Sequence, residues 1–106
     1  MSKVGAIALG ATAMNLSLAG IRVTEVADAR DGESVLDALL QDKLDVIIIE
    51  ESLRGHFSDR MQDRLRRHKG APLLVNCPSF DEEDTDVDAY LSSVIKPAVG
   101  FEIRLV

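Results

Sequence analysis

The hydrophobic positions of this chain follow two periods, one typical of strands and one typical of helices. Short apolar runs predict buried strands, and the alternation of apolar and polar residues over 21–26 predicts a strand near a sheet edge. The predicted strands cover residues 4–9, 21–26, 46–49 and 73–75. The run 46–49 is apolar throughout, which is typical of a central strand covered on both faces.

Between and after these strands, apolar residues recur at helical spacing. Capping residues precede these stretches, and Gly or Pro follows most of them. The predicted helices run from Thr12 to Leu18, from Asp31 to about Gln41, from Ser52 to His68, and from Thr85 until Pro97 ends the last one. Beyond Pro97, apolar and polar residues alternate over 98–106, which indicates extended backbone.

Strands that alternate with helices favour a parallel sheet with helices packed on both faces. We therefore predict a small three-layer α/β sandwich with about four parallel strands, of the flavodoxin or receiver type, followed by a C-terminal helix and an extended tail. Residues 1–106 form one domain by length. The tail 98–106 is predicted to be either a last edge strand or an arm that binds a partner.

Composition narrows the choice of function. Hydrophobic residues make up 46% and charged residues 28%, which is ordinary for a globular domain. The net charge of −6 argues against nucleic acid as a partner. Cys77 is the one cysteine, so neither an internal disulfide nor a metal site built of cysteines can form. Glycines and polar residues interrupt the apolar N-terminus, which predicts a strand and a helix rather than a signal peptide or a membrane insertion.

The stretch DVIIIEES, residues 45–52, places two carboxylates where a buried strand ends. It resembles the segment of response-regulator receivers that ends in the phosphorylated Asp, with Glu50 at that position, and Lys96-Pro97 resembles their Lys-Pro pair. Phosphoryl transfer there requires Mg²⁺ held by acids after the first strand. Leu9, Gly10 and Ala11 stand in that place. We therefore interpret Glu50 and Glu51 as the acidic start of a helix capped by Ser52, and keep a degenerate receiver-like binding domain as the alternative.

Other candidate chemistry is sparse. The two histidines, His56 and His68, lack the spacing of known ligand sets. The basic cluster 64–69 is predicted to compensate a helix dipole, with an acidic partner as the alternative. The acidic loop 81–88 is predicted to be solvated, with a bound cation as the alternative. Neither a dinucleotide glycine pattern nor a phosphate loop is present in the sequence. The sequence thus predicts no catalytic, cofactor or metal site, and favours a binding or structural module.

Four segments, in order along the chain, resemble the F subunit of the rotary V/A-type ATPases. They are LSLAGI (16–21), DVIIIEESL (45–53), APLLVNCPS (71–79) and AVGFEIRL (98–105). The chain departs from the family at Ala11, where Gly-Asp is common after the first strand, and at Pro97, which interrupts the last helix.

The resemblance implies a non-catalytic component of the central stalk, cytoplasmic and peripheral to the membrane. Such a component binds the coiled-coil D subunit and, through the complex, the catalytic A and B subunits. It helps to couple or regulate ATP hydrolysis or synthesis with ion transport. The apolar residues of the last helix and the tail are the expected partner contacts, namely Val94, Ile95, Val99, Phe101 and Ile103.

Overall fold

Strands and helices alternate along residues 3–80, which are the part of the chain that the computed structural model describes. The elements are β1 (Val4–Ala8), α1 (Gly10–Leu18), β2 (Arg22–Glu25), α2 (Ala29–Leu39), β3 (Val46–Glu50), α3 (Glu51–Arg54), α4 (Asp59–Arg66) and β4 (Leu73–Cys77). The four predicted strands are confirmed. The predicted helix from Thr85 and the predicted tail 98–106 lie outside the described residues.

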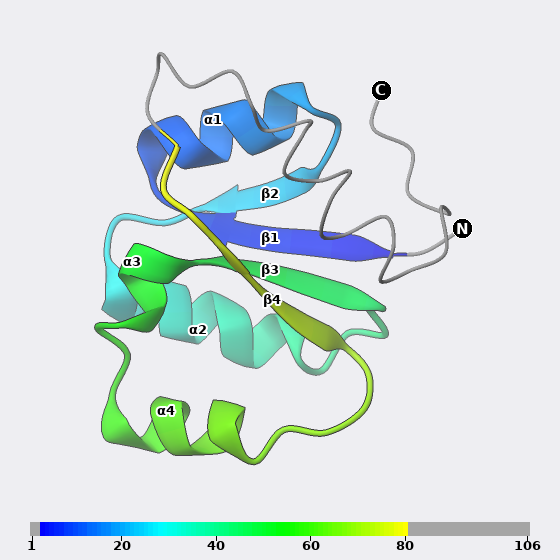
Figure 1. Cartoon of the computed structure of the whole chain (residues 1–106), viewed down its shortest axis with the longest axis vertical. Coiled ribbons are helices and arrows are strands. Elements are labelled where there is room, and N and C mark those ends of the chain that lie inside the picture. The colour runs from blue at the N-terminus through cyan, green and yellow to red at the C-terminus, as the bar shows by residue number, and fades with distance from the viewer. Residues whose placement is uncertain (1–2, 81–106) are drawn as a thin grey trace.

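The strands form one parallel sheet in the order β2-β1-β3-β4 (Figure 1). The second strand is therefore an edge strand, as its mixed pattern predicted, and its residues are mostly exposed. Every residue of β3 is buried, as predicted for a strand covered on both faces. The register places Glu50 opposite Cys77, so the ends of β3 and β4 lie side by side.

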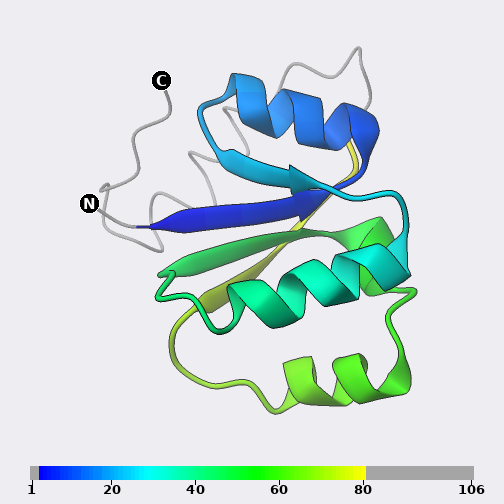
Figure 2. The same ribbon diagram turned by 180° about the vertical axis from the view of Figure 1, so that it is seen from behind.

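Side chains of successive strand residues enter two separate cores. Val46 and Ile48 belong to the core under α1, whereas Ile47 and Ile49 belong to the core under α2, α3 and α4. Figures 1 and 2 show α1 at the β2 side of the sheet and α4 at the opposite side. Helices on both faces of a parallel sheet confirm the predicted three-layer α/β fold.

The single helix predicted for residues 52–68 is wrong, because the structure has two helices there. Gly55 follows α3 as its C-cap residue, and Ser58 caps α4 by accepting a hydrogen bond from the Met61 N–H at 3.3 Å. The predicted apolar stripe nevertheless persists across the break, because all its members enter the same core. They are Leu53, Phe57, Met61 and Leu65. Hydrophobic periodicity alone could not reveal the break between α3 and α4, because the apolar residues keep their four-residue spacing across it.

Two predicted helix starts are also corrected. The first helix begins at Gly10, with Leu9 as an N-cap that provides no side-chain hydrogen bond. The second begins at Ala29, because the Asp28 carboxylate accepts from the Asp31 N–H at 2.9 Å and caps the helix. The Asp31 carboxylate in turn accepts from the Ala27 N–H at 3.1 Å. This reciprocal pair has the logic of a capping box.

Candidate functional site

Glu50 is a buried acid at the carboxyl edge of the sheet, the edge at which α/β proteins commonly bind ligands. Its side chain is 3% exposed. One carboxylate oxygen, Oε1, accepts from the Leu9 N–H at 2.8 Å. The other, Oε2, accepts from the hydroxyls of Ser52 and Ser79, each at 2.7 Å. The three donors lie just after β1, in the first turn of α3 and just after β4, so one carboxylate at the end of β3 joins the segments that follow three neighbouring strands.

These bonds correct the predicted role of the acidic pair. Glu50 is the N-cap residue of α3, as predicted for an acid at a helix start, but its carboxylate is buried and accepts hydrogen bonds from Leu9, Ser52 and Ser79. Ser52 is not a helix cap, since its hydroxyl donates to Glu50. Of the two acids, Glu51 is the exposed one, and it lies in the first turn of α3, where negative charge was expected. Hydrogen bonds that satisfy a buried carboxylate stabilise it in place and leave little accepting capacity for a ligand.

A second polar contact ties α1 to the segment after β4. The Thr12 hydroxyl accepts from the Phe80 N–H at 2.9 Å and donates to the Phe80 carbonyl at 3.1 Å. Both residues are buried, although they are far apart in the sequence. Thr12 was predicted to be a helix cap, but its side chain instead holds the segment after β4 against α1.

Replacing Thr12 by valine, which has the same shape, is expected to lower the free energy of unfolding by about 2 kcal/mol. The loss arises because both backbone groups of Phe80 are left buried without this partner. Urea unfolding measures the loss. Thr24→Val, at an exposed position of β2, is the matched control and should have little effect. Equal stability of the two variants would contradict a structural role for the Thr12 hydroxyl.

Cys77 lies beside the Glu50 carboxylate and is fully buried. Burial first, and then the nearby Glu50 and Glu51 carboxylates, raise the pKa of the Cys77 thiol to about 12. The thiol donates to the Pro78 carbonyl at 3.2 Å. A thiol that stays protonated and inaccessible is a poor nucleophile. The prediction that Cys77 is a small buried residue is therefore confirmed.

The raised pKa of Cys77 predicts an alkaline loss of stability. In the unfolded chain a thiol ionises near pH 8.5, so above that pH the folded state holds a proton that the unfolded state has lost. The free energy of unfolding should thus fall by about 1.4 kcal/mol per pH unit towards pH 12. Comparison with Cys77→Ala across pH 8 to 11 isolates this contribution. Parallel pH profiles for the two proteins would contradict it.

The remaining candidates lie apart from this edge. His56 lies in the connection between α3 and α4 rather than on a helix. His68 lies after α4, and its Nε2 donates to the carbonyls of Gly70 at 3.2 Å and Pro72 at 2.7 Å. Arg64 and Arg66 occupy the last turn of α4, as predicted for dipole compensation. Within residues 3–80, no three acidic, histidine or cysteine side chains gather as metal ligands.

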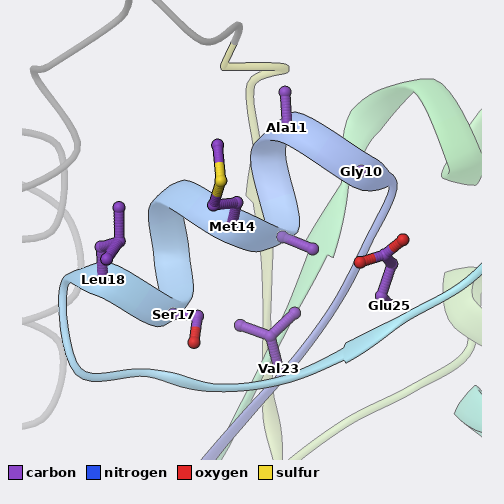
Figure 3. A pocket seen from close by; sticks show the side chains of 8 residues that line it. Gly10, Ala11, Met14, Ser17, Leu18, Val23 and Glu25 are labelled. Atoms are coloured by element: carbon purple, nitrogen blue, oxygen red, sulfur yellow. The ribbon is translucent and has the colours of Figure 1, made fainter.

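An open hollow of about 560 Å³ lies between α1 and β2. Its lining comes from Gly10, Ala11, Ala13, Met14, Ser17, Leu18, Val23 and Glu25 (Figure 3). Among residues 3–80, neither lysine nor arginine, which would pair with phosphates, contributes to this lining. The sequence analysis did not predict this surface. The sequence does hold a signal for it, since residues 4–21 contain no charged residue.

The family model of the ATP synthase (F/14-kDa) subunit matches residues 4–94 of the chain. The chain belongs to this family. Members from two strains of Thermus thermophilus, each named as the F subunit of a V-type ATP synthase, are each 26% identical to it over 97 residues. Each match covers 89% of this chain and 92% of the relative. The predicted resemblance to the F subunit is therefore confirmed.

Two of the segments that resemble the family lie next to each other at the carboxyl ends of the strands. Two of the segments that carried the resemblance, 45–53 and 71–79, meet through the β3–β4 pairing and through the bond between Glu50 and Ser79. The predicted partner contacts, from Val94 to Ile103, lie outside the described residues. In the described part, no helix has the length and apolar character needed to cross a membrane.

Proposed function

We propose that the chain is the F subunit of a V-type ATP synthase, a non-catalytic component of its central stalk. It binds the coiled-coil D subunit and helps to couple or regulate ATP hydrolysis or synthesis with ion transport. The family match over residues 4–94 carries this proposal, and the names of the two Thermus relatives support it.

The geometry of the sheet edge supports a non-catalytic role. The acid that stands where a receiver carries its phosphorylated residue is Glu50, which is buried and already accepts three hydrogen bonds. The turn after β1 provides Leu9 and Gly10 rather than acids that could hold Mg²⁺. The Cys77 thiol beside it is protonated at neutral pH. Together these side chains organise the fold and leave no free nucleophile among themselves.

The partner contacts in this proposal are the apolar positions of residues 94–103. Val94 and Ile95 lie at helical spacing with the apolar residues before them, and Val99, Phe101 and Ile103 alternate with polar residues. A segment with this pattern can bind as an apolar strip along a partner. Through the D subunit the chain joins the catalytic A and B subunits, peripheral to the membrane on its cytoplasmic side.

Co-expression with a candidate coiled-coil D subunit, followed by affinity capture of this chain and size exclusion, tests the proposal. We expect the two proteins to elute together in low salt and to capture the catalytic subunits of the ATPase from an extract that contains them. Recovery of neither the D subunit nor the catalytic subunits, with a kinase or transcription partner in their place, would refute the rotor function.

A degenerate receiver-like binding domain is the second candidate, favoured by the position of Glu50 at the end of a central parallel strand. An active receiver changes on binding Mg²⁺ and beryllofluoride, which mimics a phosphoryl group. We expect the amide chemical shifts of Glu50 and its neighbours to stay unchanged when both are added. Saturable shifts at this edge would instead support phosphoacceptor chemistry.

A further inference from the structure

We draw no further inference here: the strongest candidate, the outer face of α1 with its exposed Met14 and Leu18 beside the hollow towards β2, is an unpartnered apolar face, and nothing among residues 3–80 shows what covers it.

Discussion

Replacing Glu50 by leucine is expected to lower the free energy of unfolding by about 3 kcal/mol, which corresponds to a fall in melting temperature of roughly 15 °C. The leucine keeps much of the side-chain volume but accepts no hydrogen bond. The half-buried Leu9 N–H then loses its acceptor, and so do the hydroxyls of Ser52 and Ser79, although these two residues are exposed and their hydroxyls can turn to water. Each buried donor left unsatisfied costs about 1–3 kcal/mol, and the mobile hydroxyls can recover part of this.

Glu50→Gln is the matched control for this change. Its carbonyl oxygen can still accept from the Leu9 N–H, and its amide can donate to the two serine hydroxyls, which rotate to accept. We therefore expect glutamine to cost about 1 kcal/mol, well below the cost of leucine. Urea unfolding followed by circular dichroism measures both. Leucine that proved as stable as glutamine would show that the three bonds are not what holds this edge together.

Truncation after Lys96 is expected to abolish the complex with the D subunit, weakening binding at least about a hundredfold, while the fold is retained. The described side chains of the two apolar cores lie at or before Phe80, so all of them remain in the truncated chain. The same co-expression and size-exclusion measurement reports the loss, and circular dichroism reports the fold. A truncated chain that still elutes with the D subunit would refute the role of the tail.

Substitutions within the tail test whether its apolar side chains, rather than its mere presence, are what bind the D subunit. Phe101→Ala with Ile103→Ala removes two of the alternating apolar side chains, and we expect it to weaken the complex about tenfold or more. Glu102→Ala with Arg104→Ala alters the intervening polar positions and should have a much smaller effect, because exposed charges contribute little to affinity. Equal losses for the two pairs would contradict an apolar strip and favour recognition by charge.

The sequence by itself determined the four strands between residues 3 and 80 and the apolar stripes of the helices that alternate with them, although it joined α3 and α4 into one helix. It could do so because burial imposes a period on neighbouring residues, two for a strand and about 3.6 for a helix. The run 46–49 predicted a strand covered on both faces, and residues 21–26 predicted an edge strand. Both were confirmed by the order β2-β1-β3-β4. The family could likewise be inferred from short segments taken in order.

Only the tertiary structure decided what the polar residues do. A serine, threonine or glutamate next to a helix start suggests a cap when only its neighbours are known. Thr12 instead binds Phe80, and Glu50 binds Leu9, Ser52 and Ser79. Likewise, the sequence predicted a helix at α1 without deciding which of its faces is covered, and the fold leaves Met14 and Leu18 exposed. Hydrogen-bond partners and surface coverage depend on residues distant in the chain, and a local period carries no information about them.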